Sequence, residues 1–221
     1  MYSDSDMMEP LEKAKFIIRN NVDSGYLEAY NTFMRESKKN SAESDYYLGL
    51  MYARGQGVPK NYETARVWFE KGFDGGHPGC AYYLGIINLK GLSVEQNSKK
   101  AKEYFLMAAG RGDVRAEYEL GLLHFKDNDI PRDLEVSASW MKLAAEHGHI
   151  EAQFILGQYY KSGAGVDRDI PLAVRWLMTA ALNGHLGAQI LLGNMYRNGD
   201  GVPQNLDEAE RWYDMADANR N

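Results

Sequence analysis

A repeat of 36 residues constrains the fold of this chain more than any other feature of its sequence. The pair Leu-Gly recurs at that spacing in five copies, with no insertion or deletion between them. The copies are Leu48-Gly49, Leu84-Gly85, Leu120-Gly121, Leu156-Gly157 and Leu192-Gly193. An aromatic residue keeps the same spacing, at Trp68, Tyr104, Trp140, Trp176 and Trp212. A repeat of about 20 to 50 residues predicts stacked units that share one continuous core.

Local signals predict a first helix in each copy. In the first copy, the residues at helical spacing on one face are Asp45, Leu48, Gly49 and Tyr52. Glycine inside a helix costs about 1 kcal/mol relative to alanine. Its recurrence in every copy therefore indicates that a paired helix approaches closely there. Gly55 and Gly57 then supply the left-handed backbone that ends a helix.

A second helix follows after each glycine turn. It is expected to begin at an Asn or Asp, because these side chains cap free N–H groups at a helix start. The five candidates are Asn61, Asn97, Asp133, Asp169 and Asn205. Ala65, Trp68 and Gly72 are predicted to form its buried stripe. Because a single helical hairpin cannot bury both of its faces, the copies must stack, and the sequence predicts an all-α solenoid.

The predicted solenoid divides into five repeats and one N-terminal cap. The repeats are 44–79, 80–115, 116–151, 152–187 and 188–221. Residues 1–43 are interpreted as a degenerate capping repeat, because Val22, Tyr26, Ala29 and Phe33 match residues 36 positions later. Lys13 stands where the repeat would have its glycine. Terminal repeats are commonly atypical.

The repeat pattern resembles the Sel1-like repeat, a relative of the tetratricopeptide repeat. The fourth copy carries it most completely, with Ala152, Leu156, Gly157, Tyr160, Gly163, Gly165, Val166, Ala173, Trp176, Ala180, Ala181 and Gly184. The resemblance implies an αα superhelix of stacked 36-residue hairpins. It also implies an adaptor that holds a protein or peptide in signalling, protein quality control or host–microbe contact.

Two turns depart from the pattern in the middle of the array. Asp127 and Asp129 replace the two turn glycines of the third repeat, and Ser93 replaces the second glycine of the second repeat. Aspartate adopts the left-handed region less readily than glycine. We expect this part of the array to be less rigid than the fourth and fifth repeats.

Charge and composition exclude several classes of function. The chain has 25 Lys and Arg against 31 Asp and Glu, a net charge of -6, which argues against general nucleic-acid binding. The sequence contains no stretch of about 18 apolar residues, so it predicts no membrane-spanning helix. The first residues lack the pattern of a secretory signal, and the one cysteine, Cys80, allows no intramolecular disulfide. A cytoplasmic protein is expected.

The sequence predicts no catalytic residue, cofactor site or metal site. Cys80 occupies a position held by alanine or serine in other copies, which indicates a buried space-filling residue. His77, His149 and His185 share one repeat position and should lie too far apart for joint metal binding at about 2 Å. His124 replaces a core tyrosine. Two alternatives stay open: an inert spacer, and a hydrolase of β-lactam or peptidoglycan-like substrates, as in the family's cysteine-rich branch, whose paired cysteines this chain lacks.

A partner is expected on the first helices, which line the concave face if the copies stack as tetratricopeptide-like hairpins. Twelve residues at positions offset from the Leu-Gly face form this predicted surface, here called the first-helix surface: Tyr46, Leu50, Tyr82, Ile86, Leu89, Tyr118, Leu122, Phe125, Gln158, Lys161, Asn194 and Arg197. Its apolar half lies in the first three repeats, with Leu89 and Phe125 as anchors, and Lys161 and Arg197 add a basic flank. The aromatic residues at position 46 and its equivalents have a second interpretation, as packing between copies.

Overall fold

The computed structural model describes residues 8–126 and 129–219 of the chain. These residues contain α-helices and one short 3₁₀ helix, η2 (Asp23–Gly25), and no strand. The cap contains α1 (Pro10–Arg19) and α2 (Tyr26–Ser37). The five repeats contain α3 (Ala42–Arg54) and α4 (Tyr62–Asp74), α5 (Pro78–Lys90) and α6 (Ser98–Ala109), α7 (Val114–Phe125) and α8 (Leu134–Glu146), α9 (Ile150–Ser162) and α10 (Ile170–Leu182), and α11 (Leu186–Asn198) and α12 (Leu206–Ala218).

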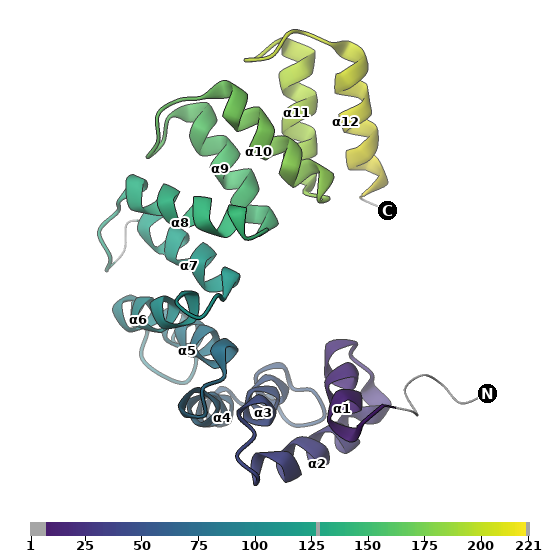
Figure 1. Ribbon diagram of the computed structural model, residues 1–221, viewed down its shortest axis with the longest axis vertical. Coiled ribbons are helices and arrows are strands. Elements are labelled where there is room, and N and C mark those ends of the chain that lie inside the picture. Colours follow the sequence, from purple (N-terminus) through teal and green to yellow (C-terminus); the bar gives the residue numbers. More distant parts are fainter. Residues whose placement is uncertain (1–7, 127–128, 220–221) are drawn as a thin grey trace, which may run out of the picture. The chain divides into compact units, whose positions relative to one another are not determined.

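The chain forms two compact units, divided between Asp113 and Val114. The first unit holds the cap and repeats 1 and 2, and the second holds repeats 3 to 5. Within each unit every helix packs against the next one along the chain (Figure 1). The predicted all-α solenoid of helical hairpins is confirmed.

The helix ends follow the signals in the sequence. All five predicted Asn and Asp residues are N-caps of the second helices, and Asn61 Oδ1 accepts a hydrogen bond of 2.9 Å from Thr64 N. Gly55 ends α3 in the left-handed conformation, at φ 76°. Each first helix begins two residues before the predicted repeat boundary, as α3 does at Ala42.

The two helices of a repeat touch at the recurring glycine, as predicted, but the partner residue is one position later than expected. In repeat 1 the ring of Phe69, not that of Trp68, lies against Gly49. Phe69 is fully buried, whereas Trp68 is only half-buried. The buried stripe is therefore Ala65, Phe69 and Gly72, and the prediction for Trp68 was wrong. The facing residues of the five copies are Phe69, Phe105, Met141, Leu177 and Tyr213.

A buried amide joins three consecutive helices in each of repeats 4 and 5. Gln189 is fully buried on α11, and its Nε2 donates to the carbonyl oxygen of Ala181 at 2.9 Å. Its Oε1 accepts from Asn219 Nδ2 at 3.1 Å. Gln153 makes the equivalent bonds to Ala145 O and Asn183 Nδ2. A buried polar group must find partners, so this side chain fixes both the hairpin and its stacking on the preceding repeat.

The cap behaves as a helical hairpin that continues the core of the first repeat. Ala14, Ile17, Ile18, Ala29 and Phe33 are buried in one cluster with the side chains of α3 and α4. The ring of Phe33 stacks on that of Tyr47 at 5.0 Å between centroids. The degenerate repeat therefore covers the end of the array.

In the altered turn of repeat 2, a serine holds a left-handed backbone conformation that glycine would adopt at lower cost. Ser93 has φ 61°, and the glycines at the same position in repeats 1 and 4, Gly57 and Gly165, have φ 72° and 70°. Asp129 is exposed, and Asp127 lies outside the described residues. The structure thus places a measurable turn mismatch in repeat 2.

Candidate partner-binding surface

In the first unit, the first-helix surface is mostly half-buried. Tyr46, Tyr82, Ile86 and Leu89 each keep part of their side chain exposed. Leu50 does not, because it is 4% exposed and belongs to the core shared with the cap. Leu50 is therefore a core residue and is not available as a partner anchor.

Three of the four aromatic residues at position 46 and its equivalents pack between copies, whereas the fourth, Tyr82, lies 6.0 Å from the ring of Phe105 in its own repeat. Each of the three contacts the histidine that precedes the next first helix, with ring centroids 4.2 to 4.3 Å apart. The pairs are Tyr46 with His77, Tyr118 with His149, and Phe154 with His185. These stacks support the second interpretation of Tyr46 and Tyr118, as contacts that hold consecutive repeats together.

Two of these histidines also cap the next helix, a role that the sequence did not reveal. His185 Nδ1 accepts a hydrogen bond of 3.0 Å from Ala188 N, and its Nε2 lies 2.9 Å from Glu151 Oε2. His149 Nδ1 accepts from Ala152 N at 3.3 Å. Burial lowers the pKa of His149, although Glu151 and Glu117 oppose the shift. The position of these two histidines, directly after a helix-ending glycine and directly before a new helix, was the sequence signal for this capping role.

In the second unit, the first-helix surface presents one large apolar side chain to solvent. Phe125, at the end of α7, is 42% exposed. Its ring lies 6.2 Å from that of Tyr159, and the Arg132 guanidinium stands 5.6 Å from its centre. Leu122 is half-buried one turn earlier, and Gln158 on α9 is exposed. Phe125 is thus an accessible aromatic side chain at the end of α7.

Of the two cations in the predicted basic flank, Lys161 is held in an ion pair and Arg197 is accessible to a partner. Lys161 Nζ lies 2.7 Å from Asp200 Oδ2, so this side chain joins repeat 4 to the turn of repeat 5. The ion pair lowers the pKa of Asp200. Arg197 is exposed, contacts Asn194 Oδ1 at 3.4 Å and stands 5.7 Å from the centre of the Tyr213 ring. Arg197 is the cation that can meet a partner directly.

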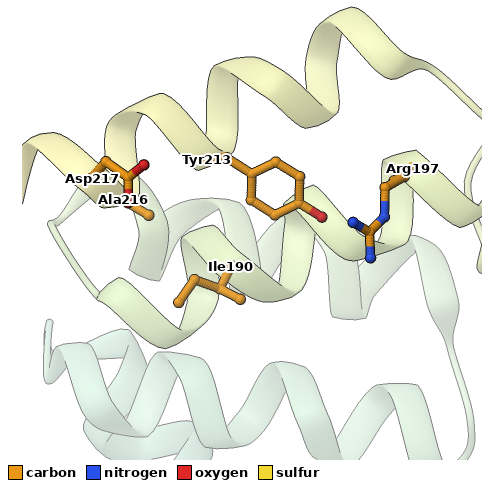
Figure 2. Close-up of a pocket in the computed structure, with 5 residues that line it drawn as sticks. All are labelled: Ile190, Arg197, Tyr213, Ala216 and Asp217. Carbon is orange, nitrogen blue, oxygen red and sulfur yellow. The ribbon is translucent and has the colours of Figure 1, made fainter.

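A pocket of about 340 Å³ opens beside Arg197, between α11 and α12. We call it the end pocket, and it is lined by Ile190, Arg197, Tyr213, Ala216 and Asp217. Figure 2 shows Arg197 at one end and Asp217 with Ala216 at the other, with the Tyr213 ring between them. The Tyr213 hydroxyl donates to Asn194 Oδ1 at 2.8 Å. Of these residues, the predicted surface included Arg197 alone.

The residues considered for chemistry lie in structural positions. Cys80 is fully buried, and burial raises the pKa of its thiol to about 12. A thiol with so high a pKa is a poor nucleophile near neutral pH. His124 is buried on α7. Among the residues that the structure describes, no group of three or more His, Cys, Asp or Glu side chains is arranged to hold a metal ion.

The comparison with protein families assigns the repeats. The Sel1 repeat pattern matches residues 42–77, 78–113, 114–149, 150–185 and 187–216. The chain belongs to the Sel1 repeat family. The matched segments agree with the five helical hairpins that follow the cap, and the cap itself is not matched. No curated protein matches the chain.

Several solved structures share the fold of this chain. A Sel1 repeat protein from Oxalobacter formigenes is 28% identical with a TM-score of 0.75, over 85% of this chain and 75% of that chain. The protective antigen c5321 of uropathogenic Escherichia coli is 25% identical with a TM-score of 0.83, over 97% of this chain and 50% of that chain. The immunity protein Pa5087 of Pseudomonas aeruginosa is 18% identical with a TM-score of 0.59, over 97% and 85% of the two chains. No helix among the described residues has the length and apolar character needed to cross a lipid bilayer.

Proposed function

We propose that this Sel1 repeat protein is a non-catalytic adaptor that binds a partner protein or peptide on its first-helix surface. The observation that carries the proposal is the exposure of Phe125 at the end of α7. A large exposed aromatic side chain on a helix suits an interface anchor, because such residues supply much of the energy of protein association. Sel1 repeats commonly serve as interaction modules, which supports the same function.

The neighbours of Phe125 indicate the chemistry of the partner. Leu122 extends the apolar contact on α7, and Gln158 offers hydrogen bonds on α9. Arg197 on α11 adds a positive charge. A matching segment is amphipathic, with an apolar anchor toward repeat 3 and an acidic residue toward repeat 5. Charge at the rim contributes less than a buried anchor and weakens with salt.

An immunity role is one form of this proposal. The partner would then be a toxin that the protein neutralises by binding. Pa5087 is described as an immunity protein, and at 18% identity its likeness supports only the shared fold. The other form is a regulatory or scaffolding partner. Both forms require a protein partner. The location proposed with them is the cytoplasm, where a lone buried cysteine such as Cys80 stays reduced.

Affinity purification followed by mass spectrometry tests the proposal. The bait is the full chain, compared with Phe125→Asp and Leu89→Asp variants whose thermal stability is measured in parallel. A partner that is captured by the wild type and lost from Phe125→Asp, at unchanged stability, supports the adaptor. Leu50→Asp is the matched control, because a charge in the core should unfold the first unit instead.

The hydrolase alternative is tested on the same preparations. The adaptor proposal expects no turnover of β-lactams or peptidoglycan fragments. Turnover that survives Phe125→Asp but is lost in Cys80→Ser or His124→Gln, with the fold intact, would replace the adaptor with an enzyme.

A further inference from the structure

An arginine of repeat 3 stands against the proposed anchor Phe125. The guanidinium carbon of Arg132 lies 5.6 Å from the centre of the Phe125 ring, within the range of about 6 Å for a cation–π contact. Both side chains are exposed. Phe125 is the last residue of α7, and Arg132 lies two residues before α8, so both belong to the turn of one hairpin (Figure 1). An apolar surface and a positive charge are therefore adjacent within the second unit.

The backbone of the turn places these two residues next to each other. Asp133 N donates to His124 O at 2.9 Å, and Phe125 and Arg132 are the residues just inside this bond. Equivalent bonds, each 2.9 Å long, close the turns of the other four repeats. The pair is thus positioned by a feature that the whole array uses.

The side chain at position 132 has a different role in repeats 4 and 5. Arg168 Nε donates to Lys161 O at 3.1 Å, and Gln204 Nε2 donates to Arg197 O at 2.8 Å. In both repeats this side chain holds the carbonyl group of the residue across the turn. In repeat 3, the guanidinium of Arg132 lies near the ring of that residue instead. Its N–H groups are therefore directed to the same exposed surface as the ring.

The neighbouring helices give the anchor a fixed support. The Tyr159 ring of α9 is buried, with its centroid 6.2 Å from that of Phe125. The Tyr159 hydroxyl shares a hydrogen bond of 3.0 Å with Ser137 Oγ of α8, which donates to Gly121 O of α7 at 2.8 Å. Burial raises the pKa of Tyr159, while the Ser137 bond and the positive charge of Arg132 oppose the shift. The exposed ring therefore rests on a buried, hydrogen-bonded contact between three helices.

The other charges of the described turn leave Arg132 to set the sign of the surface. The carboxylate of Asp133 accepts two hydrogen bonds, of 3.0 and 3.1 Å, from N–H groups in the first turn of α8. The exposed side chains of Lys126 and Asp129 are opposite in charge and offset each other. A partner that covers the ring thus meets a positive charge beside it.

We propose that Phe125 and Arg132 form one composite site, which selects a partner helix that carries a carboxylate side chain one turn from a large apolar side chain. The apolar side chain packs on Phe125, and the carboxylate accepts hydrogen bonds from Arg132. The planar fork of arginine can bind both oxygens of a carboxylate. Side chains one turn apart on a helix have Cβ atoms about 5 to 6 Å apart, which matches the separation of ring and guanidinium. This inference rests on the proposed function, because it names the partner chemistry of the same site.

A displayed library of helical peptides, randomised on one face, tests the composite site. It is selected against the full chain as wild type, Arg132→Glu and Phe125→Asp, each checked for its fold by urea unfolding. Peptides selected by the wild type should carry Asp or Glu one turn from a large apolar residue at least about threefold more often than the unselected library. Arg132→Glu should select Lys or Arg there instead. Arg168→Glu, at the same position of repeat 4, is the matched control and should keep the preference for an acid.

A selected peptide with a fluorescent label then gives affinities by anisotropy. Arg132→Gln in the protein and an acid-to-amide change in the peptide should each weaken binding about three- to tenfold. The two changes together should weaken it no further than one alone, because both remove the same ion pair. Added salt should reduce the effect of Arg132→Gln. Phe125→Asp should weaken binding at least about tenfold.

Three results would overturn the composite site. The first is a set of peptides that need Phe125 but show no preference for an acid, or a preference that Arg132→Glu leaves unchanged. That result would keep the proposed function and remove Arg132 from it. The second is an equal effect of Arg168→Glu, which would mean general attraction between charges. The third is failure to select any peptide that needs Phe125, which would overturn the proposed anchor as well, so the two failures are distinguishable.

Discussion

A Cβ atom placed on Gly49 would stand 2.5 Å from Cε1 of Phe69, closer than van der Waals contact allows. Phe69 is fully buried, so its ring has no free space into which it can move. This relationship recurs in all five repeats, with the residue 20 positions after each recurring glycine in the place of Phe69. It explains why the array keeps a glycine inside every first helix.

Gly49→Ala should lower the stability of the protein despite the better helix propensity of alanine. Overpacking costs about 1 to 3 kcal/mol, and the propensity gain returns about 1 kcal/mol. We expect a net loss of about 1 kcal/mol and a melting temperature lower by about 2 to 4 °C. Gly121→Ala is the matched comparison, because it meets the flexible end of Met141 and should cost less. Equal losses in the two variants would contradict the packing argument.

Ser93→Gly should raise stability. A non-glycine residue in the left-handed region costs roughly 1 to 2 kcal/mol, which exceeds the entropy cost of glycine, about 0.5 to 1 kcal/mol. Urea unfolding should show a gain of about 0.5 kcal/mol or more. Ser139→Gly, inside α8, should show a loss of about 0.5 kcal/mol because glycine disfavours a helix interior more than serine does. The repeat pattern of the sequence separately predicts that glycine at positions 127 and 129 raises the melting temperature by a few degrees, since each mismatch costs about 1 kcal/mol.

Stability should fall as the pH drops below the pKa of an ordinary histidine. The pKa of His149 is lowered in the folded state, so the unfolded chain binds a proton first. The resulting contribution is present above about pH 6.5 and is lost as the pH falls toward the folded pKa. His149→Asn keeps a cap at this helix start and removes the titration. The unfolding midpoint of this variant should therefore shift less between about pH 7.5 and 5 than that of the wild type. Equal shifts in the two proteins would show that His149 is not the cause of the pH dependence.

Gln189→Leu should destabilise the second unit. The change removes the hydrogen bonds of Gln189 to the Ala181 carbonyl oxygen and to the Asn219 amide. Each lost hydrogen bond costs about 0.5 to 1.5 kcal/mol, because Ala181 O keeps its bond from Gly184 N and Asn219 is exposed to water. Gln158→Leu is the control, because Gln158 is exposed and should change stability by less than about 0.5 kcal/mol. Urea unfolding measures the loss of stability in both variants. Similar losses would contradict the structural role assigned to Gln189.

The repeat made the fold predictable to the level of individual caps. Glycine, asparagine and aspartate act through local backbone preferences, so the ends of helices such as α3 and α4 could be inferred from sequence alone. The contact of Phe69 with Gly49 was missed, although position 69 keeps the same period. The recurring aromatic residue at position 68 suggested a core position, but the orientation of the helix leaves Trp68 half-buried.

The candidate site was less predictable, because exposure depends on which neighbours happen to cover a side chain. Leu50 and Phe125 were assigned to the same surface by helical geometry. The cap buries Leu50, and Phe125 stays open at the end of α7. Lys161 pairs with Asp200 of the next repeat. Side-chain partners of this kind are tertiary facts that the repeat pattern does not contain.

The central claim, that this array binds a protein through its first-helix surface, is tested most directly by quantitative capture with wild type and Phe125→Asp. We predict one specific protein that is retained by the wild type and at least about tenfold depleted from the variant. We also predict that both chains unfold at the same urea concentration. An identical set of captured proteins, or a Phe125→Asp chain that has lost its fold, would contradict the claim.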